Sequence, residues 1–516
     1  MKLRQNGFAT LMILFMTCCF STAYAHDGHP TEDMIAQQLG NLGKVDFSIS
    51  CDEVAQAAMN KGVAILHHMM YAQAELHFTQ AIGKSPNCAM LYWGYAMTLF
   101  HPLWPDTIST EALDRGRKAL ETAQTLSATV REEDYLQAAH SYFQPQKDGR
   151  SRTQQWATAQ QRVYRSYPDD LDAAAFYALS MLTVASRRDP EFTENRTAGE
   201  LLSTILARSP EHPGAIHYSI HAYDNAALAN LGVDSARAYD KIAPDVPHAL
   251  HMPSHIFVRL GLWQDVVQWN LRSAQAALKY PAKGATSLHY VHAMDYLIYG
   301  YLQDGKADEA LKASAHIASK YPLQNTFPAA YALAAIPARI ALEQAHWQRA
   351  SELELGAPDH ISWEKFPQVE AITHFARGVG AARSGQVIQA QQSLEQLDRL
   401  YLKTQTKGAG WLPFVDAQRL TVKAWIAFEE QALDTALSLM RQAADLEDST
   451  DKNPVTPGAV LPARELLADM LVLSQDPQQA VIEYQASLAL NPNRLYSRLG
   501  VERAKTLIAQ NLTQNR

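Results

Sequence analysis

The sequence of 516 residues is poor in cysteine, with four in all, and it has no hydrophobic run of transmembrane length. A membrane-spanning helix needs about 20 apolar residues, and the apolar run at residues 8–20 is shorter. No long run of lysine and arginine occurs, and the formal net charge is −8. Because nucleic acid is bound chiefly through its phosphates, these absences exclude it as the expected partner. They also exclude a membrane-spanning segment.

The common catalytic motifs are missing as well. The sequence contains no phosphate-binding loop, no glycine-rich dinucleotide fingerprint, no G-x-S-x-G elbow and no HExxH. It also lacks the sustained alternation of apolar and polar residues that is typical of half-buried strands. Alanine, leucine and glutamine are abundant, and prolines stand mostly where helices would begin or end. The sequence therefore predicts an all-α fold.

The first 25 residues have the features of an export signal. Lys2 and Arg4 supply positive charge before the apolar run, and Ala23-Tyr24-Ala25 is an A-x-A cleavage site. We expect cleavage after Ala25 and a periplasmic or secreted protein. Removal of the two basic residues would take the net charge from −8 to −10.

A poorly structured leader is expected over residues 26–50, because glycines and a proline interrupt any helix there. Two cysteines leave with the signal, and Cys51 and Cys88 remain. In an oxidising compartment an even pair suggests a disulfide, and two separately buried thiols are the alternative.

A pattern of small, bulky and small residues, often closed by a proline, recurs at the spacing of the tetratricopeptide repeat. The small residues let two helices of a hairpin approach closely, and the bulky one fills the seam. The matching sets are Ala74-Phe78-Ala81-Pro86, Ala198-Leu202-Ile205-Pro210, Ala310-Ser314-Ile317-Pro322, Ala480-Tyr484-Ser487-Pro492, Ala390-Leu394-Leu397 and Ala436-Met440-Ala443. Residues 51–516 thus resemble the tetratricopeptide-repeat (TPR) superfamily, which implies a right-handed α-solenoid of roughly ten to twelve helix pairs with irregular inserts.

Three further stretches carry a closer resemblance, to a family of exported bacterial TPR proteins with a central histidine-rich motif. They are Cys88–Met97 with His101-Pro-Leu-Trp104, His248–Phe257, and Pro454–Gly458 with Pro462–Leu467. This resemblance implies a superhelical solenoid and implies no reaction.

Histidines concentrate in one part of the chain. Eight of the 19 fall between His212 and His292, and His217 and His221 are followed 34 residues later by His251 and His255. Thirty-four residues is the TPR period, so these four side chains would occupy equivalent places on neighbouring helices. The central repeats at about 213–322 are therefore the predicted site.

The TPR resemblance implies which of these side chains face the concave groove. With units that begin at Pro213, Pro247 and Val291, the groove positions hold histidines and aspartates three or four residues apart, which places them on one helix face. The predicted metal ligands are His217, His221, Asp224, His248, His251, His255, His289, His292 and Asp295. Trp93 and Tyr299 fall at groove positions too, and they are predicted ligand contacts.

Neutral imidazole is the commonest metal ligand, and carboxylates serve as further ligands or orient the second ring nitrogen. Three histidines with a carboxylate suit Zn, Cu, Fe or Ni. The leading hypothesis is an exported binding protein or scaffold that holds a metal ion, and a protein, peptide or small ligand, in its groove. A metal-dependent enzyme is the first alternative. A purely structural scaffold, with the histidines as internal hydrogen-bonding groups, is the second.

Overall fold

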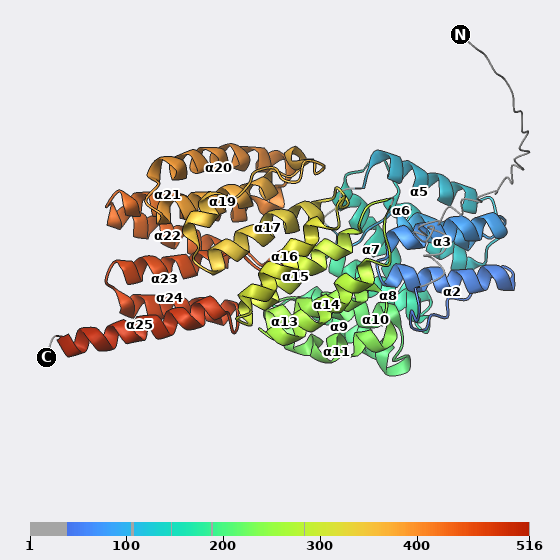
Figure 1. Cartoon of the computed structure of the whole chain (residues 1–516). Coiled ribbons are helices and arrows are strands. Elements are labelled where there is room, and N and C mark those ends of the chain that lie inside the picture. Colours follow the sequence, from blue (N-terminus) through green and yellow to red (C-terminus); the bar gives the residue numbers. More distant parts are fainter. Residues whose placement is uncertain (1–38, 105–107, 146, 187–188, 283, 515–516) are drawn as a thin grey trace, which may run out of the picture.

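The protein is described from a computed structural model, which covers residues 39–514 apart from 105–107, 146, 187, 188 and 283. The predicted signal peptide lies outside these residues. In the described part the secondary structure is helical and no strand forms, which confirms the all-α prediction. The N-terminal helices form one end of the molecule and the C-terminal helices the other, with α13–α17 between them (Figure 1).

The N-terminal third is a series of helix pairs that begin at capped ends. Asp52, Ser109, Asp148 and Asp170 each accept a backbone N–H bond at a helix start, and Thr129 forms a capping box with Glu132. The helices here are α2 (Glu53–His67), α3 (Tyr71–Lys84), α4 (Ala89–Thr98), α5 (Thr110–Ala123), α6 (Val130–Tyr142), α7 (Gly149–Ser166), α8 (Leu171–Val184) and α9 (Thr193–Arg208).

The central third contains the histidine-rich repeats. Its helices are α10 (Pro213–Tyr223), η1 (Ala229–Gly232), α11 (Val233–Ile242), α12 (Pro247–His251), α13 (Pro253–Arg259), α14 (Trp263–Ala277), α15 (Leu288–Gln303), α16 (Ala307–Ala318), α17 (Phe327–Glu343) and α18 (Trp347–Ser351). Prolines open α10, α12 and α13, where the missing N–H costs no helical bond.

The C-terminal third continues the pairs and ends on a long single helix. Its helices are η2 (Trp363–Lys365), α19 (Pro367–Arg383), α20 (Val387–Lys407), η3 (Ala409–Trp411), α21 (Leu412–Glu429), α22 (Leu433–Asp448), α23 (Ala463–Leu473), α24 (Pro477–Leu490) and α25 (Leu495–Gln514). Eleven helix pairs can be followed from α2 to α24 when α12 and α13 are taken as one arm, within the expected range.

Seven of these pairs turn in the same way. The short turn between their two helices contains one residue with positive φ, in the left-handed region that closes a helix C-terminus. These residues are Met69, Gly261, Gly305, Ala345, Gly385, Gln431 and Gln475. Consecutive helices pack on one another throughout the described chain. The fold is therefore a tetratricopeptide-type α-solenoid, as the sequence predicts.

The repeat positions form the seams between helices. Ala74, Phe78 and Ala81 are buried, and so are the corresponding residues near Ala198 and Ala480. Phe78 shows why the pattern needs small neighbours: a Cβ atom added to Gly62 or Gly94 would lie 2.3 or 2.2 Å from its ring. The bulky residue of each set thus fills space that glycine and alanine leave open.

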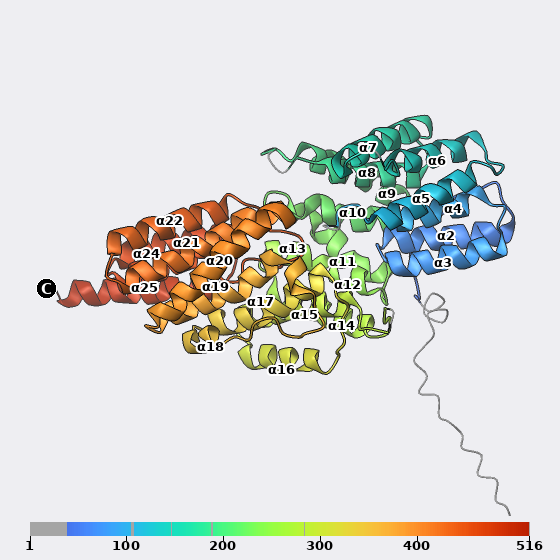
Figure 2. The same cartoon turned by 90° about the horizontal axis from the view of Figure 1, so that it is seen from above.

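The solenoid curves until its first helix reaches the fifth pair. Helix α2 contacts α10, and the Nδ1–H of His217 donates to the carbonyl oxygen of His67 at 2.6 Å. Figure 2 shows α10 between the N-terminal helices and α11–α13. The concave side of these repeats is therefore packed against other parts of the same chain.

Two segments without regular structure take part in this packing. Residues 39–50, the described part of the expected leader, form no helix, yet Leu39 and Phe47 are buried. The Leu42 carbonyl accepts a bond from His68, and the N–H of Lys44 donates to the Glu211 carbonyl. Absence of regular structure does not mean loose packing in this segment.

The second segment, residues 449–462, connects α22 to α23 and passes beside the central helices. Asp451 pairs with Arg259 of α13, and the Pro454 carbonyl accepts a bond from Tyr296 of α15. The Gly458 carbonyl accepts a bond from Arg339 of α17. The C-terminal repeats are thereby attached to the histidine-rich ones.

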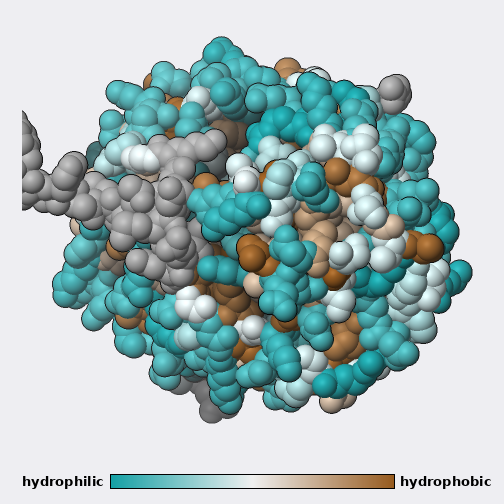
Figure 3. Space-filling view, turned by 90° about the vertical axis from the view of Figure 1, so that its right-hand side faces the viewer, coloured by the Kyte–Doolittle hydropathy of each residue, from teal (hydrophilic) through white to brown (hydrophobic). Residues whose placement is uncertain are grey.

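The described helices include none that is both long and apolar enough to cross a membrane. Seen from the N-terminal end, the surface is mostly hydrophilic, with apolar side chains scattered among polar ones (Figure 3).

The structure contains the predicted disulfide. Cys51 precedes α2 and Cys88 caps α4, and the two lie 5.7 Å apart between Cα atoms at a sequence separation of 37. The bond joins the beginning of the first helix pair to the beginning of the second. It holds the end of the solenoid, where a repeat has only one neighbour.

Replacing both cysteines by serine should lower the free energy of unfolding by about 2–4 kcal/mol, because the bond restricts the unfolded chain. Urea unfolding of the oxidised parent and the variant measures this difference. The same difference should vanish when the parent is reduced; a parent that is equally stable with and without reductant would contradict the expectation.

Candidate metal centre

Three neighbouring helical arms of the central repeats carry the histidines. His217 and His221 lie on α10, His248 and His251 on α12, and His255 on α13. The third arm is α15, which carries His289 and His292. The middle arm contacts both of the others, through α13 with α10 and through α12 with α15, so side chains distant in sequence meet in one buried region.

The middle arm is not the single helix that the spacing of His251 and His255 predicts. Helix α12 ends at His251 and α13 begins at Pro253, because proline lacks the N–H that would continue the helical bonds. Met252 between them keeps helical angles. The two histidines therefore still face each other, with their Nε2 atoms 3.1 Å apart.

The histidines divide into two groups instead of the single cluster that the sequence suggests. His251, His255 and His292 form the 251 triad, and His217, His221 and His248 form the 217 triad. In each triad, one potential ligand atom from every residue lies within 4.8 Å of the others. His248 and His251 lie three residues apart on the short helix α12 but fall in different triads, with ring centroids 6.4 Å apart.

In the 251 triad the tautomers of two rings are determined by their partners. The Nδ1 of His251 lies 2.8 Å from Oδ1 of Asn270, and the Nδ1 of His255 lies 2.8 Å from Oδ2 of Asp224. The Asn270 amide group donates to the Val266 carbonyl, so its Oδ1 is the atom that faces His251. Both acceptors are oxygens that cannot donate, so both Nδ1 atoms carry the proton.

It follows that the facing Nε2 atoms of His251 and His255 both present lone pairs when the rings are neutral. Two lone pairs at 3.1 Å repel unless a cation lies between them. A tetrahedral metal ion with bonds of about 2.0–2.1 Å would hold two ligand nitrogens about 3.3 Å apart. The observed spacing fits such an ion, and His292, with its ring centroid 4.3 Å from that of His251, completes three ligands.

The 217 triad has the same chemistry with fewer internal bonds. The Nδ1 of His217 donates to the His67 carbonyl, which leaves its Nε2 with a lone pair. That Nε2, the Nε2 of His221 and both ring nitrogens of His248 are buried and have no hydrogen-bond partner. Unpaired buried polar atoms are rare in folded proteins, so a cluster of them calls for a ligand.

Burial keeps these imidazoles in the form that binds metal. Burial lowers the pKa of His221 to about 3 and that of His289 to about 4. The pKa values of His248 and His251 fall well below the ordinary range, first through burial and then through neighbouring imidazoles. Burial also lowers the pKa of His255, although Asp224 acts in the opposite direction.

Neither predicted carboxylate ligand belongs to a triad. Asp224 accepts a hydrogen bond from His255 and also pairs with Arg259 and Lys452. Its contribution to the 251 triad is therefore to orient the His255 ring. Asp295 is fully buried in an ion pair with Arg339. Asp295, a predicted ligand, therefore lies outside both triads, and the sequence does not show that α17 brings a guanidinium to it.

His289 also lies beside the triads without joining one. Its ring centroid is 5.4 Å from that of His248 and 6.2 Å from that of Trp104. The remaining histidine of the window, His212, caps α10 and contacts Asp172 instead.

Trp93 and Tyr299, the predicted ligand contacts, are buried and do not lie on an open groove. Trp93 stacks on Phe47, because the leader segment covers it. Tyr299 is buried, and its hydroxyl accepts a bond from Arg494 at the start of α25. In both cases a segment distant in sequence covers the face of the helix that the repeat positions predict to be open in the groove.

A third group was missed because its members lie in different repeats. His67 of α2 meets Asp172 of α8 at 2.8 Å, and Tyr218 of α10 bonds the other ring nitrogen. Both nitrogens of His67 are thus satisfied, and the group acts as a buried link between three repeats. His67 stands out in the sequence only through its neighbour His68, whose ring is satisfied by Tyr239 and Leu42.

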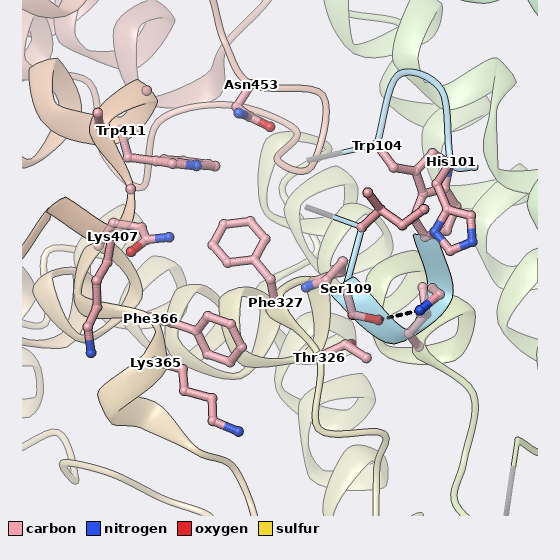
Figure 4. A pocket seen from close by; sticks show the side chains of 18 of the residues that line it. His101, Trp104, Ser109, Thr326, Phe327, Lys365, Phe366, Lys407, Trp411 and Asn453 are labelled. Carbon is pink, nitrogen blue, oxygen red and sulfur yellow. Dashed lines mark hydrogen bonds between the residues drawn. The ribbon is translucent and has the colours of Figure 1, made fainter. Parts of the chain in front are cut away.

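A cavity of about 760 Å³ opens next to the triads, between the N-terminal and C-terminal repeats. Aromatic side chains supply much of its wall, and Figure 4 shows Trp104 and His101 on one side facing Phe327 and Trp411 on the other. Trp104 lies 5.9 Å from His248 between ring centroids. One indole ring therefore stands between the cavity and the 217 triad.

Fold and site together define a class: a tetratricopeptide-type solenoid with a buried polyhistidine centre. No protein-family model matches the chain, and no curated protein matches it. Among solved structures the chain is similar to yeast Tom70, at 12% identity over 89% of this chain and 96% of that one, with a TM-score of 0.32. It is also similar to the TPR domain of P58(IPK), at 11% identity over 89% and 99% with a TM-score of 0.21. An IFIT1 monomeric mutant with Gppp-AAAA is 11% identical over 77% and 82%, with a TM-score of 0.34.

Mildly acidic pH should lower the stability of the metal-free protein, because buried histidines resist protonation in the folded state. His68 provides a test of this cause. Burial lowers the pKa of His68 from 6.5 to about 3 in the folded state. Between these values the unfolded chain binds one more proton than the folded one, so stability falls as pH falls. His68 alone should contribute a loss of about 2 kcal/mol between pH 7 and pH 5.

Urea unfolding in the presence of a chelator, at several pH values, measures this slope. His68→Gln should make the slope shallower by about one proton. An unaltered slope in His68→Gln would show that His68 does not resist protonation.

Proposed function

We propose that this protein binds a transition-metal ion through His251, His255 and His292. The observation that supports the proposal most directly is the pair of Nε2 atoms at 3.1 Å, each with its lone pair directed at the other because both Nδ1 atoms donate elsewhere. A proton between them would require a charged imidazolium in a buried region next to Lys452 and Arg259. A metal ion bound by three neutral nitrogens suits the same space.

The hydrogen bonds that two of the ligands make through their other ring nitrogen support this assignment. Metal-binding histidines almost always donate their other ring nitrogen to a carboxylate, a carbonyl or a similar acceptor. His255 does so to Asp224, and His251 does so to Asn270. Zn, Cu, Fe and Ni all accept imidazole donors, so the ligand set is compatible with each of them.

A metal-dependent enzyme is the second candidate, and the cavity beside Trp104 favours it. Three protein ligands leave an open position on a tetrahedral ion, which is the arrangement of catalytic sites. The cavity would admit a small molecule or a short peptide close to His248 and His289. A role as a scaffold for other proteins would use the outer faces of the solenoid, since the concave side of the first repeats is filled.

Export of the protein is part of the proposal and rests on residues 1–25 alone. The expected mature chain begins at His26.

Replacing His251 and His255 together by alanine should remove the bound metal. Added Zn²⁺ should raise the melting temperature of the metal-free parent and not that of the variant, because a ligand specific to the folded state stabilises it by mass action. At a free metal concentration 100 times the Kd, the expected stabilisation of the parent is about 2.7 kcal/mol. Metal analysis of untagged protein and thermal melts provide both readouts.

Two further variants distinguish loss of metal binding from loss of stability. The double variant also leaves Asn270 Oδ1 without the donor from His251, at a cost of about 1–3 kcal/mol, while Asp224 keeps Arg259 and Lys452 as partners. His292→Ala breaks no hydrogen bond described for this ring and should weaken metal binding with little loss of stability in chelator. His68→Gln alters a buried histidine whose nitrogens are both satisfied, so it should retain the metal. Equal gains in melting temperature for the parent and both triad variants would refute the metal site.

A further inference from the structure

The 217 triad contains buried nitrogens that no function assigned so far explains. Four ring nitrogens are buried without a partner: Nε2 of His217, Nε2 of His221, and both nitrogens of His248. His67 and His68, which link helices of the fold in the same protein, have partners for both ring nitrogens. The 217 triad departs from this behaviour at all three of its members.

The geometry of these rings is that of a ligand set. The ring centroid of His217 lies 4.9 Å from that of His221 and 5.1 Å from that of His248. One nitrogen from each ring lies within 4.8 Å of the others. His217 and His221 are four residues apart on α10, which places both on one helix face. The bond from His217 to the His67 carbonyl directs its Nε2 lone pair toward the other two rings.

We propose that the 217 triad is a second metal site, so that the folded chain holds two copper ions side by side. The proposal rests on the proposed function of the 251 triad, and its own evidence is the set of unpaired nitrogens in the 217 triad. The sites are neighbours, because His248 of one and His251 of the other lie 6.4 Å apart between ring centroids on the same short helix.

The charges around the two triads favour copper in its monovalent state. All six ligands are neutral imidazoles. The carboxylates nearest to them are already paired, Asp224 with Arg259 and Lys452, and Asp295 with Arg339. Two divalent ions would place four uncompensated positive charges in a buried region, whereas two Cu⁺ ions place only two there. Among the metals that imidazole binds, copper is the one with an accessible monovalent state that three donors satisfy.

The test is a titration of metal-free, untagged protein with Cu⁺ under anaerobic conditions, against a coloured Cu⁺ chelator. The parent should bind two copper ions per chain. His221→Ala/His248→Ala should bind one, and this variant breaks no hydrogen bond described for those two rings, so it should remain folded. His251→Ala/His255→Ala should also bind one, and His68→Gln should bind two.

A second readout reports whether the ions are neighbours. After oxidation to Cu²⁺, magnetic coupling between adjacent ions should reduce the electron paramagnetic resonance signal per copper in the parent. Each single-site variant should give the full signal of an isolated ion. Full signal in the parent at two copper ions per chain would overturn the side-by-side arrangement.

The stoichiometries separate the two proposals. One copper ion in the parent, lost in His251→Ala/His255→Ala and kept in His221→Ala/His248→Ala, would overturn the second site and leave the proposed function in place. Zinc binding without copper binding would overturn the choice of copper. Absence of binding by either metal would refute the proposed function, and the second site with it.

Discussion

The hydrogen bond from His217 to the carbonyl oxygen of His67 is the contact on which the central region depends. It joins the first repeat to the fifth, so it closes the superhelix on itself and makes a concave surface into an interior. The same bond fixes the tautomer of His217 and directs its Nε2 inward. A contact that holds the fold together thus also leaves a lone pair on His217 within the 217 triad.

Closing the superhelix has a consequence for polar groups. A solenoid groove that faces water can carry histidines at no cost, but buried ones must find partners. Some of the buried polar groups have such partners and others do not. His67 and His68 are fully bonded, and Asp224 and Asp295 are neutralised by Arg259, Lys452 and Arg339. In the 217 triad, by contrast, four ring nitrogens are buried without a partner.

Irregular segments complete the interior that the helices begin. The leader covers Trp93 through Phe47, and the connector from α22 to α23 brings Lys452 to Asp224. The connector also borders the cavity at Asn453, so it touches both the support of the 251 triad and the space beside Trp104. The inner side of these repeats is therefore filled in large part by the chain itself.

The sequence by itself predicted the helical repeat and the region that carries the six triad histidines, because both follow from the spacing of residues along the chain, and it suggested the disulfide through an even pair of cysteines behind an export signal. Helix pairs follow from small and bulky residues at fixed offsets, and equivalent positions one period apart must face the same way. The tertiary structure alone decided the grouping into two triads, the pairing of Asp295 with Arg339 and the burial of Trp93 and Tyr299. These depend on how far the superhelix curves and on which distant segments fill it. Such long-range packing is the sum of many small inter-helix rotations, and no single residue spacing records it.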